Sequence, residues 1–177
     1  VFNNEEEKSM NNKNLEIEQR LNQLEDVEAI KKLKYTYALC LDEGYDGDKV
    51  AELFVNDGLW SISGVGGTAK GKDGIRQHTN NLGKDIRWGQ HNILAPVIDI
   101  APDGLSAVGK FNLICLLTMA TPEDPNKDEA YVLSGKYKDK FVKIDGKWYF
   151  EELVGSIDQS APWSEGWVKQ TFKKEQW

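Results

Sequence analysis

Apolar residues recur at helical spacing in the first quarter of the chain. From Leu15 onwards they are separated by three and four residues, as in Leu24, Val27, Ile30, Leu33, Tyr37 and Leu41. Acidic residues come first in this segment and lysines follow, an order that suits the helix dipole. The pattern predicts one long helix that ends near Asp42, because Gly44 and the Asp46-Gly47 turn signal follow it.

Two shorter helices and a strand are expected next. Asp48 can cap a short second helix, and residues 72–82 have the pattern of a third. Between them, the alternation over residues 59–63 is typical of a strand.

The remainder of the chain has the pattern of a β-meander. Strands are expected at residues 86–100, 106–121, 131–144 and 147–157. The Asp145-Gly146 pair is a strong signal for a two-residue hairpin turn. Three helices followed by long strands predict an α+β fold, a curved sheet packed on the helices as a half-open cone with an apolar pocket.

The chain is expected to hold one domain. Its 177 residues fall within the usual size of a domain, which we place at residues 15–177. A polar, Asn- and Glu-rich segment at residues 1–14 is expected to be a disordered arm. The tail after Pro162 is rich in aromatic residues.

Charge and composition exclude several classes of function. A net charge of −7 argues against nucleic acid as a partner, because phosphate binding needs a basic face. Two cysteines and two histidines form no zinc-binding spacing, so no metal site is expected. The longest apolar run, about ten residues, is too short to span a membrane. A cytoplasmic protein is expected, although a signal peptide removed before Val1 is an open alternative.

His91 and Asp42 are the candidates for acid–base chemistry. If His91 faces the interior of the cone, its imidazole is a titratable group that suits a general base. Asp42, at the end of the long helix, could orient a histidine by accepting its ring N–H and could stabilise the imidazolium that forms. The alternatives are a structural histidine bonded to a backbone carbonyl and a carboxylate that only ends a helix.

Several other residues could complete a pocket. Tyr35 and Tyr37 are candidate phenolic donors: Tyr35 lies on nearly the same helical face as Asp42, whereas Tyr37 lies about 140° away. Trp60, Asn112 and Cys115 could contact a substrate. A tyrosine or tryptophan in such a pattern is more often part of the core, and Cys115 is more often an inert thiol than a nucleophile.

Residues 24–42 and 139–150 resemble the SnoaL-like branch of the nuclear-transport-factor-2-like superfamily, whose members include bile acid 7-alpha-dehydratase, gamma-hexachlorocyclohexane dehydrochlorinase and scytalone dehydratase. Residues 59–66 look especially like the dehydrochlorinase. The resemblance covers roughly residues 20–165. It implies a cone-shaped α+β barrel that works without a cofactor and is commonly a trimer. In that group an Asp at the end of the first helix pairs with a His on the sheet, which corresponds here to Asp42 and His91.

The sequence also departs from these relatives. Tyr37 matches a tyrosine of the bile acid enzyme, but Cys115 stands where that enzyme has a second catalytic Asp. Tyr37 and Leu153 stand where the dehydrochlorinase has a basic residue and an Arg. The groups that assist the leaving group are therefore a copy of neither enzyme.

These observations favour a cofactor-independent lyase that removes water or halide from a small, largely apolar or polycyclic substrate. His91, Asp42 and Tyr37 would be its catalytic residues, with Tyr35, Trp60, Asn112 and Cys115 at the substrate. The alternatives are an isomerase or cyclase with the same base, and a non-catalytic protein that binds a small molecule. A homo-oligomer, a trimer or a dimer, is expected because exposed strand faces and the tryptophan-rich tail are costly to leave in water.

Overall fold

The computed structural model describes residues 4–63, 67–121, 124 and 126–169. In this part of the chain the helices are α1 (Asn4–Asp42), α2 (Gly47–Ala51), α3 (Gly71–Leu82) and α4 (Gly166–Lys169). The strands are β1 (Phe54–Ser63), β2 (Gly67–Lys70), β3 (Ile86–Ile100), β4 (Ser106–Ala120), β5 (Asp128–Ile144) and β6 (Lys147–Pro162). The fold is α+β, as expected.

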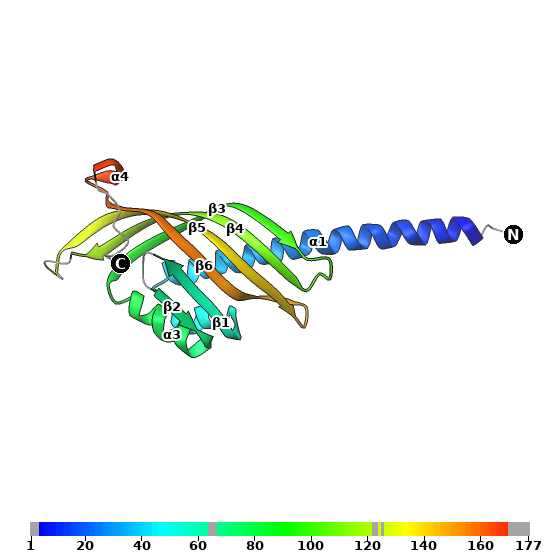
Figure 1. Ribbon diagram of the computed structural model, residues 1–177, viewed down its shortest axis with the longest axis horizontal. Coiled ribbons are helices and arrows are strands. Elements are labelled where there is room, and N and C mark those ends of the chain that lie inside the picture. Colours follow the sequence, from blue (N-terminus) through cyan, green and yellow to red (C-terminus); the bar gives the residue numbers. More distant parts are fainter. Residues whose placement is uncertain (1–3, 64–66, 122–123, 125, 170–177) are drawn as a thin grey trace.

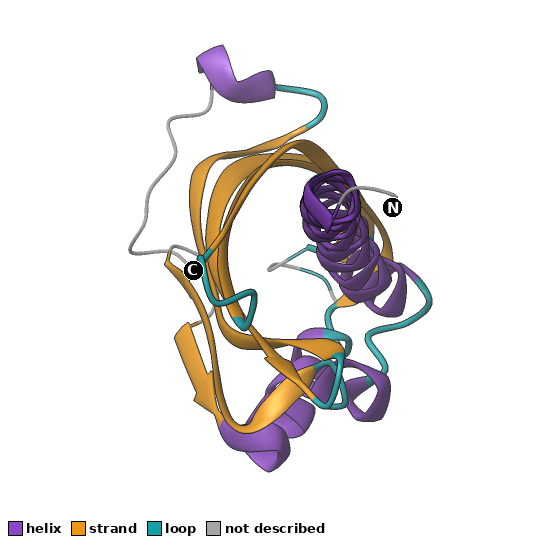
Figure 2. Cartoon of the chain, turned by 90° about the vertical axis from the view of Figure 1, so that its right-hand side faces the viewer, coloured by secondary structure: helices purple, strands orange, loops and turns teal. Residues whose placement is uncertain are grey.

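One mixed sheet forms the body of the protein. Its strand order is β2-β1-β6-β5-β4-β3, with β1 and β6 parallel and the other pairs antiparallel. The sheet does not close on itself. It curves around α1, as Figure 2 shows, and α2 and α3 cover the end near β1 and β2. This curvature encloses an apolar interior between the sheet and the C-terminal half of α1.

Helix α1 has two halves with different surroundings. In the C-terminal half, Ile30, Leu33, Tyr37 and Leu41 are buried against the sheet. In the N-terminal half, the helix extends beyond the ends of the strands, as Figure 1 shows, and every side chain over residues 10–25 is exposed. The segment from Met10 to Leu24 is therefore helical although none of its faces is buried. No helix in the described ranges is both long and apolar enough to cross a membrane.

The disordered arm expected at residues 1–14 is wrong from Asn4 on, because α1 already begins there. Residues 4–25 contain neither Gly nor Pro, the two residues that most disfavour a helix interior. The expectation of disorder rested on the polar composition of this segment. A polar composition predicts that side chains are exposed to solvent, but an exposed segment can still be helical. Residues 1–3 lie outside the described residues.

The other expected elements differ from the structure only in detail. The strand at residues 86–100 is confirmed as β3. Asp46, not Asp48, caps α2, since its carboxylate accepts hydrogen bonds from the backbone N–H groups of Asp48 and Lys49. Strand β2 was not expected, because its four residues are too short to show an alternation. In the tail, Trp163 and Trp167 are exposed, and Phe172 and Trp177 lie outside the described residues.

A buried ion pair lies beneath the sheet–helix interface. The Lys34 ammonium is 2.8 Å from the Asp139 carboxylate, and neither side chain is exposed. Asp139 also accepts a hydrogen bond from the backbone N–H of Val154, and the Lys34 Nζ lies 3.3 Å from the centroid of the Tyr137 ring. Burial lowers the pKa of Lys34 and raises that of Asp139, so each charge depends on the other. The pair ties α1 to β5 and β6.

We predict that breaking this pair from one side costs more than removing both charges. Asp139→Asn or Lys34→Met alone should lower the free energy of unfolding by about 3–5 kcal/mol, because the remaining charge loses its buried partner. The double variant should lose much less than the sum of the two. Urea denaturation measures all three, with Lys138→Met on the exposed face of β5 as a control that should change stability by at most about 0.5 kcal/mol. Additive losses would contradict the coupling.

Candidate active site

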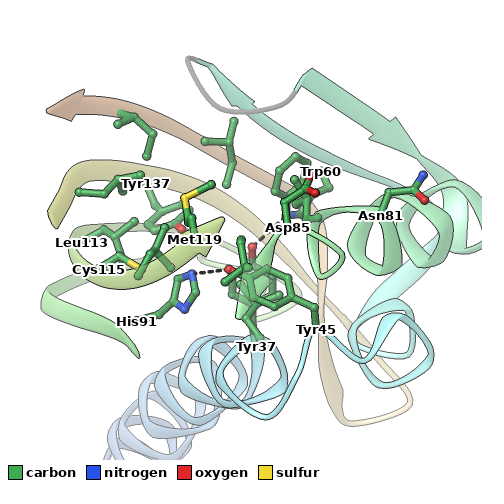
Figure 3. Close-up of a pocket in the computed structure, with 17 residues that line it drawn as sticks. Tyr37, Tyr45, Trp60, Asn81, Asp85, His91, Leu113, Cys115, Met119 and Tyr137 are labelled. Atoms are coloured by element: carbon green, nitrogen blue, oxygen red, sulfur yellow. Dashed lines mark hydrogen bonds between the residues drawn. The ribbon is translucent and has the colours of Figure 1, made fainter. Parts of the chain in front are cut away.

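A cavity of about 350 Å³ lies between the sheet, α1 and α3. Figure 3 shows Tyr37, Tyr45 and His91 close together on the helix side of this cavity, facing Leu113, Cys115 and Met119. The other lining residues are Leu41, Trp60, Ile62, Asn81, Leu82, Asp85, Ile86, Leu117, Leu133, Tyr137 and Ile157. The wall is mostly apolar, and the exposed side chains of Asn81 and Asp85 place the opening beside the end of α3.

The His91 imidazole is held by the last residue of α1. Its Nδ1 lies 2.6 Å from Asp42 Oδ1, and its backbone N–H donates to both carboxylate oxygens, at 3.0 and 3.1 Å. Because the carboxylate can only accept, we assign the proton of a neutral imidazole to Nδ1, which leaves a free electron pair on Nε2. The His91 side chain is 8% exposed and Asp42 21%, so water screens their interaction little. The arrangement fixes the orientation of the His91 ring.

Asp42 reaches His91 from outside the cavity. Tyr37 and Leu41 line the cavity, whereas Asp42 does not. This agrees with the expected angular separation of Tyr37 and Asp42 on the helix. Of the His91–Asp42 pair, only the imidazole of His91 lines the cavity.

The turn after α1 brings a second group to the imidazole. Gly44 and Tyr45 both adopt left-handed backbone conformations, with φ of 109° and 57°. The turn folds Tyr45 back under the helix end, where it is buried. Its hydroxyl lies 3.5 Å from His91 Nε2, at the outer limit of a hydrogen bond. Tyr45 therefore occupies the position at which a proton donor would approach Nε2.

Tyr37 and Trp60 form a fixed polar contact in the wall. The Trp60 indole N–H donates to the Tyr37 hydroxyl at 2.9 Å, and the Tyr137 side chain also forms a hydrogen-bond interaction with this hydroxyl. His78 of α3 packs against Trp60, with ring centroids 4.5 Å apart. Burial raises the pKa of Tyr37 and Tyr45, and that of Tyr137 as well. All three phenols are thus neutral donors at physiological pH.

Cys115 lies opposite His91 in the register of β3 and β4. Its thiol is buried, and that burial, with a smaller contribution from the Asp42 charge, raises its pKa to about 12. A thiol needs to be deprotonated to act as a nucleophile. Cys115 is therefore a neutral, apolar part of the wall.

Two of the residues expected at the substrate do not line this cavity. Asn112 is exposed and belongs to the opposite face of the sheet, because its separation of three residues from Cys115 reverses the side-chain direction along a strand. Tyr35 is 39% exposed and does not line the cavity, since it lies on the solvent side of α1. Of the expected site residues, His91, Tyr37, Trp60 and Cys115 line the cavity, with Asp42 directly behind His91.

Other lining residues were not expected from the sequence. The alternation of Tyr137 with Lys136 and Lys138 was a usable signal, because it predicts that Tyr137 points inward. Tyr45 follows a glycine in a turn, and no periodicity predicts its direction. In the described ranges, His, Cys, Asp and Glu side chains form no group of three or more that could hold a metal ion.

The comparison with protein families agrees with the geometry. A model described as a SnoaL-like domain matches residues 22–154, which contain the C-terminal half of α1, His91 and most of the sheet. The chain belongs to this SnoaL-like family. A search of curated protein sequences found no significant match.

Solved structures share the fold of this SnoaL-like protein at low sequence identity. A hexachlorocyclohexane dehydrochlorinase (LinA-type3) from Novosphingobium barchaimii is 21% identical, with a TM-score of 0.69 over 81% of this chain and 93% of that one. A candidate scytalone dehydratase from Novosphingobium aromaticivorans is 22% identical, with a TM-score of 0.70 over 80% and 90%. A Mycobacterium tuberculosis protein of unknown function, Rv3472 with the substitution D26N, is 23% identical, with a TM-score of 0.62 over 77% and 74%. The fold is thus shared by proteins with different chemistry.

We predict that the thiols of this SnoaL-like protein resist alkylation while it is folded. A pH of 8 is well below the raised pKa of the Cys115 thiol, so this thiol stays protonated. Cys40 is also buried, and its pKa is raised as well. Iodoacetamide should therefore modify neither cysteine quickly in the native protein and both after unfolding in guanidinium, as measured by intact mass. Rapid modification of Cys115 in the folded protein would contradict its assignment to the wall.

Proposed function

We propose that this SnoaL-like protein is a lyase that removes water from a small, neutral, largely apolar substrate, with His91 as the general base. The observation that carries the proposal is the His91–Asp42 contact of 2.6 Å, with the imidazole in the wall of an apolar cavity. A histidine held in one tautomer by a carboxylate is suited to proton abstraction near neutral pH.

In the proposed reaction, His91 Nε2 takes a proton from a carbon next to an activating group of the substrate. The electrons of that C–H bond form the new double bond, and the C–O bond to the leaving hydroxyl breaks. The imidazolium, stabilised by Asp42, returns the proton to the departing oxygen, so water leaves and Nε2 is free again. Tyr37 donates a hydrogen bond to the substrate oxygen. The substrate takes the place of the Tyr45 hydroxyl beside His91 Nε2.

Water is favoured over halide as the leaving group by the charges around the cavity. Of the described residues, the lining set includes no Lys or Arg but does include the Asp85 carboxylate, and its hydrogen-bond donors are mainly the neutral phenols, the Trp60 indole and the Asn81 amide. A departing halide carries a full negative charge that a cation would stabilise, whereas water leaves as a neutral molecule. The same absence of cations disfavours anionic substrates.

An isomerase or cyclase is the second candidate, because the same oriented base could move a proton without any leaving group. The mass of the product separates the two reactions. Elimination of water lowers it by the mass of one water, and isomerisation leaves it unchanged.

We predict that His91→Gln and Asp42→Asn abolish turnover while the fold persists. Wild-type protein is first screened against neutral hydroxylated metabolites for thermal stabilisation, and the products of each stabilising compound are analysed by mass spectrometry. On a substrate found in this way, His91→Gln should lower kcat by about 10²–10⁴-fold, because the base is lost. Asn112→Ala, on the opposite face of β4, is the control and should retain wild-type activity. Full activity of His91→Gln would refute the mechanism, and circular dichroism checks folding.

A separate prediction concerns Tyr37. Tyr37→Phe keeps the ring and removes only the hydroxyl, so it should lower kcat by about 10–100-fold with a smaller change in KM, because its donor acts on oxygen as charge develops there. Steady-state kinetics on the same substrate measure both values. An unchanged kcat would assign Tyr37 to the wall alone.

A further inference from the structure

The projecting half of α1 carries a row of exposed apolar side chains. Met10, Ile17, Leu21 and Leu24 are each 52–65% exposed, on a part of the helix that extends beyond the sheet. Figure 1 shows this segment without any neighbouring element. Four large apolar side chains in one row on an otherwise polar helix are costly to leave in water.

The spacing of this row is that of a coiled coil. Met10, Ile17 and Leu24 are seven residues apart, and Asn14 and Leu21 fall between them at intervals of four and three. In heptad terms, Met10, Ile17 and Leu24 occupy d positions, and Asn14 and Leu21 occupy a positions. We call these five residues the N-terminal seam.

The residues beside the seam carry opposite charges on its two sides. Lys13 and Arg20 occupy g positions along one side, and Glu18 and Glu25 occupy e positions along the other. All four are exposed. In a parallel coiled coil, a g residue faces the e residue that lies five positions later in the partner helix. Lys13 would then face Glu18, and Arg20 would face Glu25, each twice by symmetry.

We propose that the N-terminal seam binds the seam of a second copy of this chain as a parallel, two-stranded coiled coil. Charge complementarity selects a parallel copy, because an antiparallel one would place e residues opposite e residues and g opposite g, and so bring like charges together. Asn14 selects two strands in register, since a single Asn at an a position specifies that arrangement at some cost in stability.

The rest of the fold permits this pairing. At about 100° per residue, the seam lies roughly 170° around the helix from Ile30, Leu33 and Tyr37, which pack against the sheet. Two paired copies would therefore carry their sheets on opposite outer sides. Residues 10–25 span about 24 Å, just over two heptads, so the pairing is expected to depend on protein concentration.

Sedimentation of the full-length chain over a hundredfold range of concentration tests the proposal. Wild-type protein should approach twice the chain mass of 20.0 kDa as concentration rises. Leu21→Asp should prevent that step. Leu15→Asp is the matched control, because Leu15 is also exposed on the same helix but faces away from the seam, and it should associate as the wild type does. A wild-type mass that Leu21→Asp leaves unchanged would overturn the proposal. A wild-type mass of three chains that Leu21→Asp reduces to one chain would also overturn the proposal, because it would indicate that three helices, not two, meet at the seam.

Charge reversal tests the direction of the helices. Arg20→Glu should raise the Kd by about tenfold, because two attractive pairs become repulsive, and adding Glu25→Arg should restore it. In addition, Asn14→Cys should form an intermolecular disulfide under oxidation, since parallel register places the two substituted positions face to face while Cys40 and Cys115 are buried. Failure of the double reversal to restore association, or no disulfide from Asn14→Cys, would overturn the parallel arrangement.

Discussion

The contact between Asp42 and His91 fixes the geometry on which the rest of the site depends. One carboxylate binds both the ring Nδ1 and the backbone N–H of the same residue, so it sets the orientation of the imidazole and also holds the end of α1 against β3. An acid at a helix C-terminus opposes the helix dipole. The three hydrogen-bond contacts with His91 offset that cost. The chain turns directly after this carboxylate, at Gly44 and Tyr45, whose φ values are left-handed.

The cavity combines an oriented imidazole with phenol donors that stay neutral. Burial raises the pKa of the phenols and of Cys115, so the wall gains no negative charge near physiological pH. The one buried ammonium near the cavity among the described residues, Lys34, is paired with Asp139 behind Tyr137. The fold thus keeps its buried charges in pairs at the margins of the cavity. The lining residues therefore present dipoles and an imidazole, with the Asp85 carboxylate at the opening and no Lys or Arg among the described lining residues.

Sequence periodicity predicted the helices and long strands, whose side-chain patterns repeat. It did not predict features that depend on a single turn or on which face of a strand one residue occupies. Helix spacing located Asp42 at the end of α1, and strand patterns located His91 on β3. Their pairing came from the family resemblance, because residues 49 positions apart share no local pattern. Asn112 lies on the opposite face from Cys115, because a separation of three residues reverses the side-chain direction along a strand. Tyr45 was missed because its direction depends on a left-handed φ after Gly44, which no periodic pattern encodes.

The two halves of α1 are amphipathic on different sides. Ile30, Leu33 and Tyr37 direct one face of the helix into the sheet, whereas Ile17, Leu21 and Leu24 direct a nearly opposite face to solvent. A helix with a single function on the sheet would have no physical reason to place apolar residues on that second face, because each exposed leucine or isoleucine forgoes about 1.5–3 kcal/mol of burial. The change of face near Asp26 therefore divides α1 into a segment that builds the cavity and a segment shaped to meet another helix. Asp26 itself accepts hydrogen bonds from Lys143 and from the Trp148 indole, which anchors the helix to β5 and β6 where it leaves the sheet.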